Sequence, residues 1–136
     1  MRQINAYLTF DGQCREAMTF YKQALGGELQ MMPFSDMPGN HPPEVKDRIM
    51  HARLSKGVAI LMASDAVPGH PFSKGTNFSV SVDCENVQET EKMFGALSEG
   101  AKVTMPLQET FWATRFGMLT DRFGINWMFN LEKHKQ

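Results

Sequence analysis

Several short stretches of the chain alternate apolar and polar residues, the pattern of strands that bury one face. Residues 4–10 place apolar side chains at every second position, with Asn5, Tyr7 and Thr9 between them. Asp11 follows as the expected N-cap of a helix. A stripe of apolar residues at spacings of three and four, ending at Gly26-Gly27, then predicts that helix.

Three further strands are predicted in the first half of the chain. They cover residues 28–32, 48–55 and 58–63, with a turn at Lys56-Gly57 between the last two. His51 and Arg53 share the polar side of the middle strand. Residues 65–75 are rich in proline and glycine, so we expect a loop there and the boundary between two modules, about 1–66 and 76–136.

The second half of the chain repeats this order of elements. A strand is expected at 77–82, and Asn86 with Glu89 resembles a capping box before a second amphipathic helix. Residues 102–107 form a further strand, expected at a sheet edge because it contains Pro106. A hairpin of residues 112–120 and 125–131 completes the repeat. We therefore predict one α+β domain of two βαβββ modules, with a period of about 70 residues.

Paired modules of this order resemble the vicinal oxygen chelate superfamily, which includes glyoxalase I, bleomycin-resistance proteins and extradiol dioxygenases. A closer resemblance, to its PhnB-like branch, rests on residues 7–12, 17–21, 26–28, 47–54, 61–65, 102–107, 111–112 and 120–127. This resemblance implies a cupped eight-stranded mixed sheet around a ligand cavity, with helices on its outer face, and a homodimer. Some chains of the branch carry a demethylubiquinone methyltransferase label. We set that activity aside, because no glycine-rich loop joins a strand to a helix here.

Composition narrows the possible partners. The chain has 136 residues and a formal net charge of −1, which offers no electrostatic footprint for nucleic acid or an anionic membrane. Cys14 and Cys84 lie far apart and outside any metal-ligand spacing, which favours reduced thiols in a cytoplasm. No apolar run approaches the length of a membrane span.

The superfamily's metal ligands, normally His and Glu, have poor counterparts here. The resemblance places the four positions on Asn5 or Tyr7, Leu61 or Met62, Asn77 or Ser79, and Met128. These residue types do not hold a divalent first-row metal as imidazole and carboxylate do. Of the four histidines, only His51 falls on a strand, whereas His41, His70 and His134 fall in loops and a polar tail. We therefore expect no metal and no other cofactor.

The sheet face opposite the helices is expected to line the cup. The candidate ligand-binding residues are Tyr7, His51, Arg53, Met62, Asn77, Ser79, Phe111, Trp112 and Met128. His51 is the best catalytic candidate, because a histidine can move a proton near neutral pH beside an arginine that holds an anion. Alternatively, His51 only bonds a neighbouring strand. Asp121 is expected to cap its own tight turn.

These observations favour metal-independent binding of a small aromatic or amphipathic molecule in the cup. One alternative is an enzyme: a lyase or oxygenase with a rearranged metal site, or an isomerase that uses His51. Another is a dimeric scaffold whose cup is filled by its own side chains. The sequence does not identify a ligand.

Overall fold

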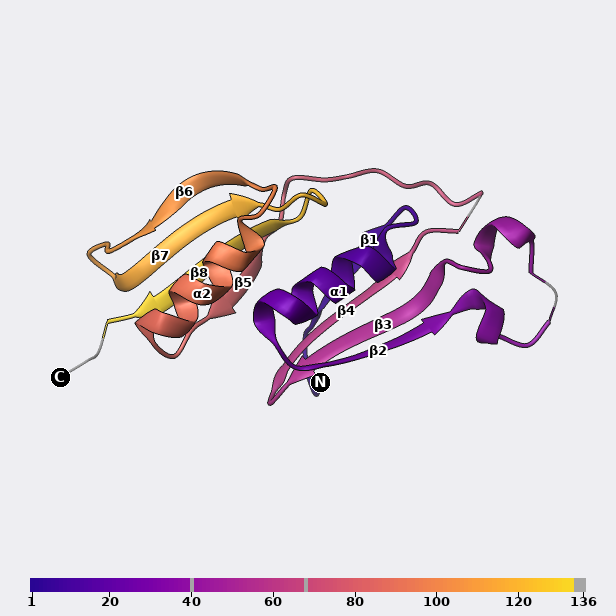
Figure 1. Cartoon of the computed structure of the whole chain (residues 1–136), viewed down its shortest axis with the longest axis horizontal. Coiled ribbons are helices and arrows are strands. Elements are labelled where there is room, and N and C mark those ends of the chain that lie inside the picture. Colours follow the sequence, from indigo (N-terminus) through magenta and orange to yellow (C-terminus); the bar gives the residue numbers. More distant parts are fainter. Residues whose placement is uncertain (40, 68, 134–136) are drawn as a thin grey trace. The chain divides into compact units, whose positions relative to one another are not determined.

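The computed structural model describes residues 1–39, 41–67 and 69–133. The chain divides into two compact units, Met1–Ser73 and Lys74–Gln136, which we call module 1 and module 2. Their boundary falls within the proline- and glycine-rich segment 65–75. Within these described residues each module contains one α-helix and one four-stranded mixed sheet (Figure 1).

Module 1 is a strand–helix–three-strand unit. Its strands are β1 (Ala6–Phe10), β2 (Glu28–Pro33), β3 (Ile49–Lys56) and β4 (Ala59–Asp65), and its helix is α1 (Cys14–Leu25). Two short 3-10 helices, η1 (Phe34–Asp36) and η2 (Pro43–Val45), lie between β2 and β3. The strand order is β1-β4-β3-β2, with β1 parallel to β4 and the other pairs antiparallel.

Module 2 repeats this topology. Its strands are β5 (Val80–Asp83), β6 (Lys102–Gln108), β7 (Ala113–Thr120) and β8 (Asn126–Glu132), and its helix is α2 (Val87–Leu97). The strand order is β5-β8-β7-β6, and as in module 1 the first pair, β5 and β8, is parallel and the other pairs are antiparallel. The predicted α+β class, the two βαβββ modules, their eight strands and the edge position of β6 are confirmed. The cup that the sheets are expected to form together stays a prediction.

Each sheet has one face covered by its helix and one open face. In module 1, Leu8, Leu54 and Leu61 are buried on the covered face, together with apolar side chains of α1. In module 2, Trp127 and Phe129 of β8 are buried on the covered face. Residues between these positions lie on the open face, because neighbouring side chains of a strand point to opposite sides. No helix among the described residues is long and apolar enough to span a membrane.

Gly117 of β7 shows how tightly α2 packs onto its sheet. A Cβ at this position would lie 2.8 Å from Cε2 of Phe94 and 3.1 Å from Cα of Leu107. Only a glycine leaves room for the Phe94 ring there. Close contact of the helix with the sheet therefore depends on one small residue in the middle of a strand.

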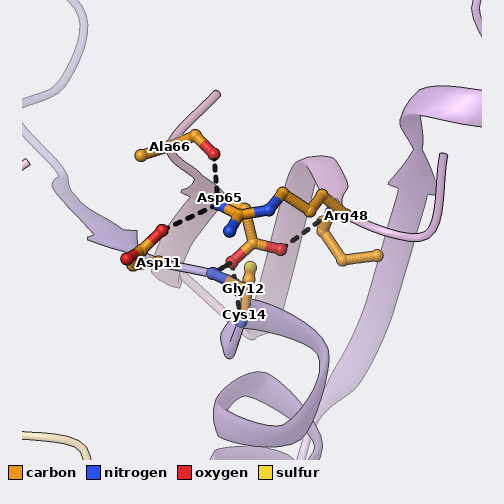
Figure 2. A network of polar contacts seen from close by, with 7 residues as sticks. Asp11, Gly12, Cys14, Arg48, Asp65 and Ala66 are labelled. Atoms are coloured by element: carbon orange, nitrogen blue, oxygen red, sulfur yellow. Dashed lines mark hydrogen bonds and ion pairs between the residues drawn. The ribbon is translucent and has the colours of Figure 1, made fainter. Parts of the chain in front are cut away.

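The N-terminus of α1 is capped from across the module rather than by its own sequence. Asp11 does not cap it: the N-cap residue is Gln13, whose side chain makes no capping bond. Instead, buried Asp65 at the end of β4 accepts hydrogen bonds from the amides of Gly12 and Cys14, at 2.8 and 3.0 Å, through Oδ1 (Figure 2). Its Oδ2 accepts from the amide of Ile49 at 2.9 Å. One carboxylate therefore joins β4, β3 and the start of α1.

Asp11 has a different partner. Nη1 of Arg48 donates to Oδ1 of Asp11 at 2.9 Å and to the carbonyl oxygen of Ala66 at 2.6 Å (Figure 2). The prediction that Asp65 begins a loop is also wrong, since Asp65 pairs with Phe10 as the last residue of β4.

The start of each module differs from the alternation pattern. Ile4, expected in the first strand, is 86% exposed and precedes β1. Asn77 and Ser79 precede β5, which begins only at Val80. The expected cap of α2 is confirmed, because Oδ1 of Asn86 accepts from the amide of Glu89 at 2.7 Å. The carboxylate of Glu89 accepts from the amide of Glu85 at 3.1 Å.

Candidate functional site

Four predicted site residues lie at neighbouring positions on the open face of module 1. Met62 of β4 pairs in register with Tyr7 of β1 on one side and with Arg53 of β3 on the other. His51 lies two residues before Arg53 and pairs with Met32 of β2. The expectation that Tyr7, His51, Arg53 and Met62 share the face opposite the helix is therefore confirmed by the register.

Tyr7 and His51 form a polar pair on this face. The Tyr7 hydroxyl lies 3.2 Å from Nδ1 of His51, and the ring centroids are 5.8 Å apart. In one tautomer Nδ1 accepts from the hydroxyl and Nε2 carries the hydrogen; in the other Nδ1 donates and Nε2 is an acceptor. Among the described residues Nε2 has no hydrogen-bond partner, so it is available to a ligand in either case.

An open hollow of about 500 Å³ lies at the end of this face. It is lined by Arg2, Gln3, Arg53 and Ile60. Arg2, Gln3 and Ile60 were missed by the sequence analysis. Alternation with Tyr7 could have indicated Gln3, and alternation with Met62 could have indicated Ile60, whereas the same alternation places Arg2 on the opposite side.

Aromatic side chains cluster in module 2. The Trp112 ring lies 4.9 Å from Phe111 and 5.4 Å from Phe116, measured between centroids, both in edge-to-face geometry. Phe111 is 89% exposed and Trp112 is 46% exposed. The cluster begins in the loop before β7, where Trp112 lies, and continues into the strand, which contains Phe116. Exposed aromatic rings in contact are a common binding surface for apolar ligands.

Met128 lies on the open face of module 2 in a row of sulfur-containing side chains. It pairs in register with Met118 of β7, which in turn pairs with Met105 of β6. On its other side Met128 pairs with Ser81, not with Ser79. Ser79 and Asn77 are exposed residues ahead of β5, so the prediction that they lie on a strand is wrong.

The residues at the superfamily's ligand positions are not the donors that a catalytic metal centre uses. Of the residues at the superfamily's ligand positions, Tyr7 offers a phenol, and Met62 and Met128 offer thioethers. Leu61 is buried on the covered face. Nickel, zinc and iron sites need imidazole, carboxylate or thiolate ligands, so these residues do not fit such a metal. No group of three His, Cys, Asp or Glu residues within 1–39, 41–67 and 69–133 is placed to hold a metal ion.

The two other described histidines, His41 and His70, lie outside the strands. Nε2 of His41 donates to the carbonyl oxygen of Met37 at 3.0 Å. His70 is exposed in the segment between the modules. His134 lies outside the described residues. None of these placements brings a second histidine to His51.

One further carboxylate and both thiols are buried and do not serve as reactive groups. Asp121 holds its turn as predicted, since Oδ1 accepts from the amides of Phe123 and Ile125 at 2.8 and 3.0 Å, and Oδ2 accepts from Nε1 of Trp127 at 2.8 Å. Burial, together with the smaller effect of nearby Asp65, raises the pKa of the Cys14 thiol to about 12. Burial also raises the pKa of Cys84. A thiol that resists ionisation is a poor nucleophile.

The family follows from comparison with known proteins. The family model described as "3-demethylubiquinone-9 3-methyltransferase" matches residues 2–129. The chain belongs to this family. It is also 33% identical to Protein YjdN of Escherichia coli over 143 residues, covering 97% of each protein.

Solved structures agree with this assignment. Protein PA1353 from Pseudomonas aeruginosa has 50% sequence identity and a TM-score of 0.90, covering 98% of this chain and 100% of that one. A putative 3-demethylubiquinone-9 3-methyltransferase, PhnB protein, from Bacillus cereus has 26% identity and a TM-score of 0.75, covering 96% and 99%. The resemblance to the PhnB-like branch is confirmed.

More distant solved structures share the fold. A glyoxalase/bleomycin resistance protein/dioxygenase family enzyme from Burkholderia phytofirmans has a TM-score of 0.60 at 17% identity, covering 96% of each chain. Identity this low supports a shared fold and leaves the chemistry to be argued from the residues.

Proposed function

We propose that the protein binds a small amphipathic molecule, without a metal, on the open face of module 1. The observation that carries this proposal is the contiguous set of Tyr7, His51, Arg53 and Met62 on the face of the module 1 sheet opposite α1. Phenol, imidazole and guanidinium groups provide hydrogen bonds, while Met62 provides an adaptable apolar contact. A polar strand face of this kind suits a ligand that has both a polar group and an apolar body.

Module 2 supplies the second part of the proposal. The aromatic cluster of Phe111, Trp112 and Phe116 would stack on an aromatic ligand, and Met128 would adapt to its shape. Asn77 and Ser79 remain proposed contacts, now as exposed groups of the segment ahead of β5 rather than as strand residues.

Methyl transfer is not part of the proposal, although the family description and the Bacillus cereus relative carry that name. Nucleotide-derived cofactors commonly use free backbone amides of a glycine-rich loop between a strand and a helix. Here the amides of Gly12 and Cys14 between β1 and α1 are occupied by Asp65. The residues at the start of α1 therefore do not fit a cofactor of that class.

The test begins with native mass spectrometry of freshly isolated protein, which would reveal a copurified organic molecule or a metal together. Ligand-observed NMR with a panel of aromatic compounds would then identify a binder. His51→Ala should weaken binding at least about fivefold, since it removes a hydrogen bond worth about 1 kcal/mol. His70→Ala, a change at an exposed histidine of a loop, is the matched control and should leave affinity unchanged.

Two outcomes would contradict this proposal. One is a panel that binds wild type and His51→Ala equally. The other is one tightly held nickel, zinc, iron or manganese per chain that His51→Ala releases. A loss of stability with unchanged affinity would instead give His51 a structural role.

Acid–base catalysis is the alternative function, and one observation favours it. The Tyr7 hydroxyl orients His51 so that Nε2 is available for proton transfer. If His51 acts as an acid–base group, Tyr7→Phe should lower kcat for an isomerisation more than it raises KM. If His51 only binds the ligand, Tyr7→Phe should raise KM more than it lowers kcat.

We also propose a symmetric homodimer. β6 is an edge strand with exposed Val103 and Pro106, and Phe111 nearby in sequence is exposed. Edge strands and exposed apolar side chains are commonly covered by a partner chain. Sedimentation at micromolar concentration should find twice the 15.4 kDa chain mass. A concentration-independent species of 15.4 kDa would rule the dimer out.

A cytoplasmic location is the last part of the proposal. Cys14 and Cys84 are both free and buried, as suits a reducing compartment. Fractionation of cells that express the protein would test the location, and recovery outside the cytoplasm would contradict it.

A further inference from the structure

Three of the four residues that line the hollow at the end of the open face of module 1 carry hydrogen-bond donors. Arg2 and Arg53 each contribute a guanidinium group, which donates and cannot accept. Gln3 has one acceptor, Oε1, which already receives a hydrogen bond from Nδ2 of Asn5 at 3.2 Å. The Gln3 amide nitrogen therefore remains as a third donor.

Neither arginine of this hollow is neutralised by the protein. Among the described residues, no carboxylate lies within ion-pairing distance of Arg2 or Arg53, whereas Arg48 and Arg115 are both paired with acids. The register places one carboxylate, Glu28, on this face, opposite Ser55 at the start of edge strand β2, and it forms no ion pair with Arg53. Two unpaired positive charges thus line one hollow.

Arg53 is exposed, so its guanidinium group is accessible to a ligand from solvent. It lies on β3, an interior strand of the sheet, with Gln30 and Met62 as its two register neighbours. Neither neighbour can balance its charge. The fourth lining residue, Ile60, gives the hollow an apolar wall.

From these contacts we infer that the hollow binds the oxyanion group of an organic ligand, a carboxylate or a phosphate. Two guanidinium groups and an amide donor match the acceptor oxygens of such a group, which arginine commonly binds by two parallel hydrogen bonds. The volume of about 500 Å³ suits a small organic acid. The apolar part of the ligand would lie over Ile60 and Met62, and this inference rests on the proposed function of the open face.

The experiment compares ligands that differ in charge and little in shape. The probes are 2-naphthoate, neutral 2-naphthamide and 2-naphthyl phosphate, titrated by ligand-observed NMR against the full chain. Wild type should bind at least one of the two anions about tenfold more tightly than the amide, because a hydrogen bond to a charged group is worth more than a neutral one. The comparison of the two anions distinguishes a carboxylate from a phosphate site. Added salt should weaken anion binding.

Substitutions test whether the arginines of the hollow cause the preference for anions. Arg53→Gln and Arg2→Gln should each reduce anion affinity about tenfold and leave amide affinity nearly unchanged. Arg15→Gln is the matched control, since Arg15 is an exposed arginine of α1, which packs on the covered face. It should bind all three probes as wild type does.

The possible failures separate the two proposals. If naphthamide binds as tightly as both anions and Arg53→Gln changes nothing, the oxyanion site is overturned while binding on the open face stands. If Arg15→Gln weakens anion binding as much as Arg53→Gln, general surface charge explains the effect and the site is overturned. If no probe binds at millimolar concentration, both proposals fail for aromatic ligands.

Discussion

Removing the carboxylate of Asp65 should cost a large part of the stability of the protein. Asp65 is 5% exposed and accepts from three backbone amides, those of Gly12, Cys14 and Ile49. Cys14 and Ile49 are completely buried, so water cannot easily replace the lost acceptor at their amides. An unsatisfied buried donor costs about 1–3 kcal/mol. We therefore expect Asp65→Ala to lower the free energy of unfolding by about 3–5 kcal/mol.

Asp65→Asn should have a smaller effect. Its remaining oxygen can still accept from Gly12 and Cys14, but its amide group places a donor against the amide of Ile49. The expected loss is about 1–3 kcal/mol. Asp36→Ala, a change at an exposed residue of η1, is the control and should change stability by less than about 0.5 kcal/mol.

Urea denaturation followed by far-UV circular dichroism measures these differences. The two tryptophans, Trp112 and Trp127, both lie in module 2, so fluorescence alone would not report on module 1. The denaturant slope should stay unchanged if only the native state is affected. A loss below about 1 kcal/mol for Asp65→Ala would refute the reasoning, because it would show that the three amides find other acceptors.

Three other changes test packing, burial and binding. Gly117→Ala should lower the free energy of unfolding by about 1–3 kcal/mol, because the added Cβ would meet the Phe94 ring. Gly95→Ala, on the exposed side of α2, is the control and should raise the free energy of unfolding by up to about 1 kcal/mol. Equal urea midpoints for the two variants would contradict the packing argument. Because the folded pKa of the Cys14 thiol is raised from 9.0 to about 12, its contribution to stability is complete below pH 9 and is lost as pH rises toward 12. Wild type should therefore lose more stability than Cys14→Ala between pH 8 and about 10.5 in urea titrations, and parallel losses would contradict this. An aromatic ligand that binds the cluster of module 2 should quench the fluorescence of exposed Trp112, and the quenching should vanish in Trp112→Phe; quenching that persists would have to come from the buried second tryptophan.

The order of elements follows from local sequence alone. Alternation over a few residues identifies a half-buried strand, and a 3.6-residue stripe identifies a helix, because both patterns depend on near neighbours. The cap of α2 was predictable for the same reason, since Asn86 and the amide it caps are three residues apart. Combined with the repeat and the family resemblance, these local patterns identified the two βαβββ modules.

The ends of a strand were less predictable, because the alternation of apolar and polar residues can continue beyond the residues that pair with the neighbouring strand. Residues 77–79 continue the alternation of β5, yet pairing with β8 begins only at Val80. Alternation shows which side a residue would take in a strand, whereas the partner strand decides how far the strand extends. This is why Asn77 and Ser79 were misplaced.

The contacts that define the cap of α1 and the hollow needed the tertiary structure. Asp65 caps a helix that begins 51 residues earlier in the chain, so no local pattern could choose it over Asp11. Arg2 and Arg53 are equally distant from each other in sequence and become neighbours only because β1 and β3 flank β4. The sequence by itself determined which elements form and which side chains take each face of a strand. Only the folded chain decided which distant charges meet and which remain unpaired, because that depends on strand order and register across the sheet.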